Sequence, residues 1–218
     1  MRLVLLGPPG AGKGTQAAAV RQALGVPHIS TGEMLRGAIS AGTAVGLKAK
    51  AIVEAGNLVP DDVMADMVEE RLAAPDAKAG FLLDGYPRNV GQGEMLQLIL
   101  DRMGRALDHV LYLMLDDAEI VRRLSGRRTC GACGAPYHVT GAPPKRTGVC
   151  DACSGSLLTR PDDREEVIVQ RLKVYRGQTE PLVDFYRGRG LLREIDASGT
   201  VPQVEARLLA AIAGALSR

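Results

Sequence analysis

The chain has 218 residues, a length that allows one large domain or one domain with inserts. Its 27 basic residues nearly balance 25 acidic ones, and a net charge of +2 argues against a nucleic-acid or membrane partner. Aromatic residues make up 3% with no Trp, so surfaces on which bases could stack are scarce. The apolar runs 3–6 and 208–216 are too short for a signal-peptide core or a membrane span, so we expect a cytoplasmic protein.

Short apolar runs alternate with helical patterns along the chain. Five runs are typical of buried strands, the second being the weakest: Leu3–Leu6, Pro27–Ile29, Phe81–Leu83, Val110–Leu115 and Leu191–Ile195. Helices are predicted over 15–24, closed by Gly25, from near Thr31, where Ser30 and Glu33 have capping-box spacing, and over 63–72. The last helix carries apolar residues at helical spacing, a stripe that we interpret as core packing: Val201, Val204, Leu208, Ile212 and Leu216. This alternation predicts a doubly wound parallel α/β sheet.

The first strand leads directly into a glycine-rich segment, GPPGAGKGT at residues 7–15, and then into a helix. This is the context of the Walker A phosphate loop, or P-loop, in which backbone N–H groups and the helix N-terminus surround phosphate oxygens. Lys13 is expected to reach the β- and γ-phosphates of a nucleotide. The residue after it is Gly14, and the hydroxyl comes one later at Thr15, so the usual direct magnesium ligand is missing.

Two segments interrupt the α/β pattern. A helical stretch from Ser30 to Val59 is one, and a region from Gly126 to Asp163, with little periodicity, is the other. The second holds two CxxC pairs, Cys130 with Cys133 and Cys150 with Cys153, and 16 residues separate the pairs. This spacing is typical of a zinc ribbon, in which four thiolates close the coordination sphere, although a redox-active CxxC or an iron site would also use it.

Two polar residues lie where ligands of α/β sheets bind, at the end of the strand 81–83. Asp84 can orient magnesium through water in place of the missing hydroxyl, or can cap the following turn. Arg88 follows a Gly-Tyr-Pro turn at the same strand end. The three histidines, His28, His109 and His138, have no partner spacing for nucleophilic catalysis and are interpreted as structural or surface residues.

Five motifs in order make the chain resemble the adenylate kinases along nearly its whole length. Besides GPPGAGKGT they are STGEMLR (30–36), FLLDGYPR (81–88) with Gln92, GRR (126–128), and TRPDD (159–163) with Arg171. The chain departs mildly from the family pattern at Glu33, where Asp is common, and at Tyr86, where Phe is common.

The resemblance implies a set of site residues. Those on the ATP side would be Gly10, Ala11, Gly12, Lys13, Gly14, Thr15, Arg123, Arg127, Pro136, Tyr137 and Gly199. Those on the AMP side would be Thr31, Arg36, Asn57, Leu58, Val59, Gly85, Tyr86, Pro87, Arg88, Gln92, Arg160 and Arg171. The catalytic groups would be Lys13, Asp84, Arg88, Arg127, Arg160 and Arg171.

The implied activity is reversible in-line transfer of the γ-phosphoryl group of Mg-ATP to AMP, which gives two ADP. We expect a P-loop core of residues 1–29, 60–125 and 164–218, an AMP-binding insert of residues 30–59, and a zinc-ribbon lid of residues 126–163. Zinc would be structural, and the protein a monomer. The alternatives are a kinase for another nucleoside monophosphate, and a nucleotide-dependent regulator that binds DNA through the ribbon.

Overall fold

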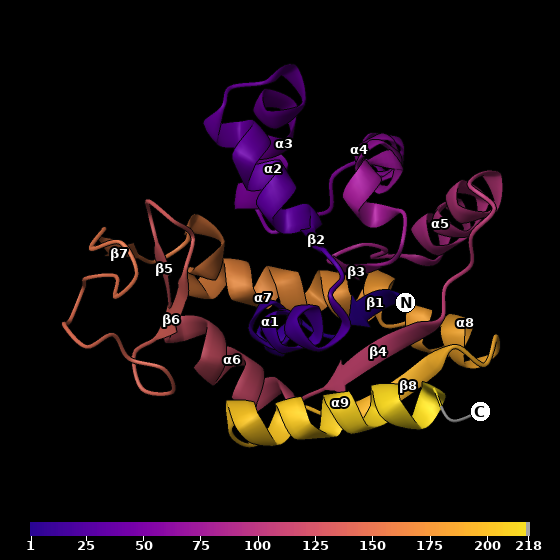
Figure 1. Cartoon of the computed structure of the whole chain (residues 1–218). Coiled ribbons are helices and arrows are strands. Elements are labelled where there is room, and N and C mark those ends of the chain that lie inside the picture. Colours follow the sequence, from indigo (N-terminus) through magenta and orange to yellow (C-terminus); the bar gives the residue numbers. More distant parts are fainter. Residues whose placement is uncertain (217–218) are drawn as a thin grey trace.

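The computed structural model describes residues 1–216, and a five-stranded parallel sheet lies at its centre (Figure 1). The sheet order is β2-β3-β1-β4-β8. The strands are β1 (Arg2–Leu6), β2 (His28–Ser30), β3 (Phe81–Asp84), β4 (His109–Met114) and β8 (Leu192–Asp196). All five predicted strands are present, each within one residue of its predicted bounds. Because β1 and β3 are buried on both faces, they read in the sequence as continuous apolar runs.

Helices cover both faces of the sheet, as the alternating pattern predicted. Val4 and Leu6 of β1 pack toward one face, against α4 (Asp61–Ala73), α5 (Val90–Arg102) and α8 (Leu182–Arg187). Leu3 and Leu5 pack toward the other face, against α1 (Lys13–Leu24) and α9 (Val201–Leu216). The fold is therefore a doubly wound α/β sheet of the P-loop type.

Further helical segments lie along the chain between these elements. They are α6 (Asp117–Ser125), α7 (Glu165–Val174), the π-helical turn η3 (Tyr175–Thr179), and the short 3₁₀ turns η1 (Pro75–Ala77) and η2 (Pro161–Asp163). Within residues 1–216 no helix has the length and apolar character needed to cross a bilayer.

Several predicted helix ends are confirmed, and one core assignment is wrong. Gly25 closes α1 with φ 65° and donates its N–H to the Arg21 carbonyl. The Ser30 hydroxyl accepts from the Glu33 N–H at the start of α2. The predicted apolar stripe of α9 begins only at Val204, because Val201, the first residue of the helix, is 43% exposed. The Leu216 side chain, the last of that stripe, lies outside the described side chains.

The segment after β2 forms two helices, α2 (Thr31–Ser40) and α3 (Ala44–Glu54), which rise from the carboxyl end of the sheet in Figure 1. They pack closely because Gly46 has no side chain: a Cβ there would lie 2.1 Å from the Ala38 carbonyl oxygen. The helical character expected for this stretch is confirmed.

The cysteine-containing segment folds around a small antiparallel sheet of order β6-β5-β7. Its strands are β5 (Arg127–Cys130), β6 (Pro136–His138) and β7 (Leu157–Leu158). Strands of two to four residues are too short to give a readable alternation, which is why the sequence pattern did not indicate them.

Candidate nucleotide site

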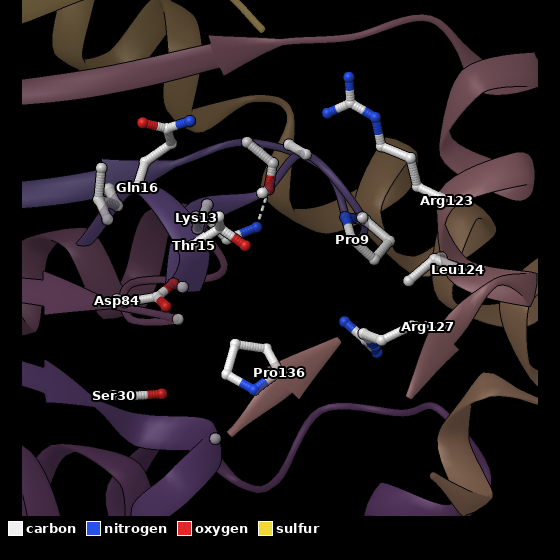
Figure 2. Close-up of a pocket in the computed structure, with 18 of the residues that line it drawn as sticks. Pro9, Lys13, Thr15, Gln16, Ser30, Asp84, Arg123, Leu124, Arg127 and Pro136 are labelled. Atoms are coloured by element: carbon white, nitrogen blue, oxygen red, sulfur yellow. Dashed lines mark hydrogen bonds between the residues drawn. The ribbon is translucent and has the colours of Figure 1, made fainter. Parts of the chain in front are cut away.

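A cavity of about 990 Å³ opens beyond the carboxyl ends of β1 and β3, and Figure 2 shows part of its lining. Lys13 lies between Asp84 on one side and Arg123 and Arg127 on the other (Figure 2). The walls come from the loop 7–15, the end of β3, the cysteine-containing segment and α7. Segments far apart in the sequence thus meet at the sheet edge where α/β proteins bind ligands.

The glycine-rich loop adopts the shape expected for a phosphate loop. Gly7 passes so close to β4 that a Cβ would lie 2.7 Å from the Leu113 carbonyl oxygen. Gly12 precedes α1 with φ 89°, a left-handed conformation that glycine adopts without strain. The N-terminus of α1 therefore faces the cavity and offers free N–H groups and partial positive charge.

Lys13 is folded back onto its own loop. Its Nζ donates to the Gly7 carbonyl at 2.7 Å and to the Pro8 carbonyl at 2.9 Å. Burial lowers the pKa of Lys13 to about 8, although the charge of Asp84 opposes this shift. A bound anion would raise the pKa of Lys13 toward its ordinary value, so the buried ammonium group should bind phosphate oxygens favourably.

Asp84 is buried at the end of β3, and His28 of the neighbouring strand contacts it. His28 Nε2 lies 3.5 Å from Asp84 Oδ2. Burial alone would raise the pKa of Asp84, but the nearby His28 imidazole and the charges of Lys13 and Arg88 outweigh it and keep the pKa below its usual value. Asp84 is therefore an ionised carboxylate beside the phosphate loop.

Arg88 is fixed through its backbone and its side chain together. Its Nε donates to the Gly85 carbonyl at 2.8 Å, and its N–H donates to Gln92 Oε1 at 2.8 Å. Its carbonyl accepts from the hydroxyl of Thr179, in the π-helical turn, at 2.6 Å. Burial lowers the pKa of Arg88, and nearby Arg36 lowers it further. Such an arginine gains most from an anionic ligand.

Three further arginines reach the cavity from the other side, and Asp163 or the Thr129 hydroxyl orients each of them. Arg127 forms a two-point contact with buried Asp163, whose Oδ1 also accepts from Arg171 at 3.1 Å. Arg160 donates to the Thr129 hydroxyl at 2.8 Å, and burial lowers the pKa of Arg160 to about 10. The cavity is thus lined by several partly desolvated cations, an arrangement suited to polyphosphates.

Comparison with known proteins identifies the family. A sequence model described as adenylate kinase matches residues 5–191. An adenylate kinase of Citrifermentans bemidjiense is 53% identical over 97% of this chain and 99% of its own length. Adenylate kinases of Acidothermus cellulolyticus and Moorella thermoacetica are 53% and 51% identical over 97% and 100% of this chain, and over 98% and 99% of their own lengths.

The chain belongs to the adenylate kinase family.

The structure brings nearly all of the residues that the family resemblance predicted into one region. Those on the ATP side line the main cavity, including Arg123, which Glu119 and the Ala197 carbonyl hold in place. Thr31, Asn57, Val59 and Gln92 line a smaller adjoining cavity of about 70 Å³, which Arg88 and Arg171 also reach. Tyr86 is the exception, because its side chain is buried in the core among the apolar residues.

Tyr137 lies in the main cavity wall, but its hydroxyl points to the cysteines. The oxygen lies 3.4 Å from Cys150 Sγ and accepts from the Asp151 N–H at 2.7 Å. Because the hydroxyl is already engaged, a ligand in the cavity could contact only the backbone and the ring of Tyr137.

The four cysteines are free and their sulfurs lie within 4.8 Å of one another. Sγ of Cys130 is 3.4 Å from that of Cys153, and Sγ of Cys133 is 3.6 Å from that of Cys150. Tetrahedral zinc with sulfur at about 2.3 Å sets neighbouring sulfurs about 3.8 Å apart, so the cluster has the size for such an ion. The N–H of Cys133 donates to the Cys130 thiol and lowers its pKa, which favours the thiolate that a metal needs. The four cysteines can hold a metal ion.

Sequence reasoning missed several residues that hold the site together. His28 was interpreted as structural or surface, yet it lines the cavity beside Asp84. Asp163 lies within the motif TRPDD. It is an acidic residue between Arg160 and Arg171 in the sequence, and this was the signal that could have identified it. Thr179 and Asp61 contact Arg88 and Gln92 across 91 and 31 residues of sequence, and no local pattern indicates such partners.

Proposed function

We propose that this chain transfers the γ-phosphoryl group of Mg-ATP in line to AMP, within one cavity whose walls close over both nucleotides. As an adenylate kinase it is an ATP:AMP phosphotransferase, and the reaction gives two ADP and is reversible. The observation that carries the in-line proposal is the placement of Lys13 and Arg88 on one cavity, with arginines from the opposite wall facing them.

The phosphate loop supports the assignment of the ATP side. Backbone N–H groups of residues 10–15 and Lys13 would hold the β- and γ-phosphates. Arg123, the backbone at Gly199, and Pro136 with Tyr137 would contact the rest of ATP, since all four line the main cavity. Arg127 would bind the phosphates, because Asp163 directs its guanidinium.

The AMP side is assigned to the smaller cavity and the wall that it shares with the larger one. Arg36, Arg88, Arg160 and Arg171 would bind the AMP phosphate. Thr31, Gln92 and the backbone of residues 57–59 and 85–87 would surround the nucleoside. The Tyr86 ring would support the site from the core without touching AMP.

Transfer between these positions requires alignment of donor and acceptor, and compensation of the charge on the transferred group. Lys13, Arg127, Arg160 and Arg171 would supply that compensation. Adenylate kinases use magnesium with ATP, and Asp84 would hold the ion through water because Gly14 offers no hydroxyl. Closure of segments 30–59 and 126–163 over the core would exclude water, a competing acceptor.

We infer that the metal held by the cysteines is zinc and that it acts structurally. Four thiolates fill a tetrahedral site, so no position remains for substrate or water. Free thiols gathered in this way are consistent with a reducing, cytoplasmic location. A monomeric state and the absence of nucleic-acid binding stay predictions, which light scattering and filter binding with DNA and RNA would check.

The acceptor preference tests the proposal directly. A coupled assay with Mg-ATP should show AMP to be a better acceptor than CMP, UMP or GMP at equal concentration, and two ADP should react in reverse. Better turnover of UMP or CMP would indicate a kinase for another monophosphate and would contradict the assignment of the AMP side.

A further inference from the structure

The side-chain amide of Gln92 forms a hydrogen bond through its oxygen and another through its nitrogen. The partner of the oxygen can only donate, and the partner of the nitrogen can only accept. Its Oε1 accepts from the Arg88 backbone N–H at 2.8 Å, and its Nε2 donates to Asp61 Oδ1 at 2.8 Å. A reversed amide would place its NH₂ group against a second donor and its oxygen against a carboxylate oxygen. The contacts therefore fix which atom of Gln92 is oxygen and which is nitrogen.

Asp61, at the start of α4, also orients a second side-chain amide, that of Asn89 at the start of α5. Asn89 Nδ2 donates to both carboxylate oxygens, at 3.0 and 3.1 Å. Asn89 in turn caps α5, since its Oδ1 accepts from the Gln92 backbone N–H at 2.7 Å. One carboxylate thus sets the positions of both side chains at the beginning of α5.

This arrangement determines what Gln92 can offer to a ligand. Gln92 is 1% exposed as a whole residue and lines the smaller cavity, together with Thr31, Leu58 and Val59. Its nitrogen carries two hydrogens, and one of them is donated in the hydrogen bond to Asp61. The other is available as a donor, which matches the ring N1 of adenine, an acceptor. In hypoxanthine and guanine the ring N1 carries a hydrogen and is itself a donor.

We propose that Asp61 is a positioning residue that makes the acceptor site selective for 6-amino purines by fixing the orientation of the Gln92 amide. Asp61 does not line either cavity, so it acts on a ligand through Gln92, which it contacts directly and also supports through the Asn89 cap. The inference rests on the proposed AMP side. It adds a selectivity determinant that lies outside the cavity lining.

Loss of Asp61 leaves the amide with one restraint, the Arg88 N–H, in place of two. The side chain can then rotate and present its oxygen to the ring N1–H of a 6-oxo purine. A hydrogen bond to a charged group contributes about 1.5–3 kcal/mol, so the ratio of kcat/KM for AMP to that for IMP should fall about tenfold or more.

The experiment measures kcat/KM for AMP and for IMP, with Mg-ATP, on the full chain and four variants, of which Gln92→Ala should lose the preference for AMP. Asp61→Ala should lower the AMP/IMP ratio about tenfold, mainly through KM. Asp61→Asn should retain most of the preference, because its carbonyl still accepts from Gln92. Asp62→Ala, an exposed neighbour in the same helical turn, should behave as the unchanged chain. A purely structural role of Asp61 would lower the rates for both acceptors alike and leave the ratio unchanged.

The outcomes separate this inference from the proposed function. If the unchanged chain does not prefer AMP to IMP, the proposed AMP side is wrong. If it does, and Gln92→Ala abolishes the preference while Asp61→Ala keeps it, the role of Asp61 is wrong.

A spectroscopic test needs no variant of Asp61. In ¹⁵N-labelled unchanged protein, one side-chain amide hydrogen of Gln92 should be protected from solvent exchange before ligand is added, and AMP should shift mainly the other. Rapid exchange of both hydrogens would overturn the proposal.

Discussion

The parallel-sheet core and the proposed lid, the cysteine-containing residues 126–163, are stabilised by different means. In the core, strands such as β1 and β3 are buried on both faces, between two apolar clusters. In the lid, the buried residues are Gly126, Cys130, Cys150 and Asp163, which together form no apolar core. A segment of 38 residues cannot fold on so little apolar burial, so its thiolates and the Arg127–Asp163 ion pair must provide the stability.

The core and the segment 126–163 contribute to the site in different ways. The core fixes Lys13, Asp84 and Arg88 through packing and backbone geometry, and these groups should keep their places whatever happens to the lid. The lid brings Arg127 and Arg160 to the same cavity from its two ends. Chemistry should therefore depend on core side chains directly and on the metal only through folding.

The largest effect is expected from removing a core cation. Lys13→Met or Arg88→Ala should each lower kcat by on the order of a hundredfold or more, because stabilisation of transition-state charge is the main catalytic contribution. Melting temperature should stay unchanged or rise slightly in Lys13→Met, since burial disfavours that charge in the free protein. Steady-state kinetics and calorimetry provide the measurements. Lys78→Met, at an exposed position, is the control, and near-normal turnover in Arg88→Ala would remove Arg88 from the site.

A smaller loss of activity, with a larger loss of local stability, is expected in the lid. Replacement of both Cys130 and Cys150 with Ser should abolish metal binding, which elemental analysis should measure as one zinc per unchanged chain. The lid should unfold locally and the melting temperature should fall, whereas some turnover should persist at low temperature. Val139→Ser, at an exposed lid position, should keep the zinc. Complete loss of turnover at low temperature in a variant with a folded core would indicate that the metal takes part in catalysis.

The smallest effect concerns pH and Lys13. The pKa of Lys13 in the free protein is lowered to about 8, so the lysine is charged at pH 7 and loses its proton above pH 8. Because the charged form binds phosphate, kcat/KM for Mg-ATP should fall to about one tenth one pH unit above that pKa. Bound phosphates raise the pKa again, so kcat should stay level to higher pH. A kcat/KM that stays level up to pH 10 would contradict this role.

The sequence predicted the core well, because its central strands are short apolar runs such as Phe81–Leu83, which are buried on both faces. It also singled out residues that the fold gathers around the two cavities, since motifs preserve spacing along the chain, and their roles stay predictions. It could not predict the strands β5 to β7, which are too short to show alternation. Nor could it predict that Val201 is exposed, because a helix's first turn can project beyond the core that its later turns contact.

The partners of the site residues were the least predictable part. Asp61 and Gln92 are brought together by packing of α4 on α5, and Thr179 reaches the Arg88 carbonyl from the π-helical turn. Such contacts depend on the tertiary arrangement of elements, which spacing within one element does not encode.

Hydrogen exchange with and without metal tests the central claim, that the lid is stabilised by its metal independently of the core. The zinc-loaded chain should show protection both in the sheet and across residues 126–163. After removal of zinc by a chelator, exchange should accelerate throughout residues 126–163, while β1, β3 and β4 retain their protection. Loss of protection in those strands together with the lid, or a lid that stays protected without metal, would contradict the account.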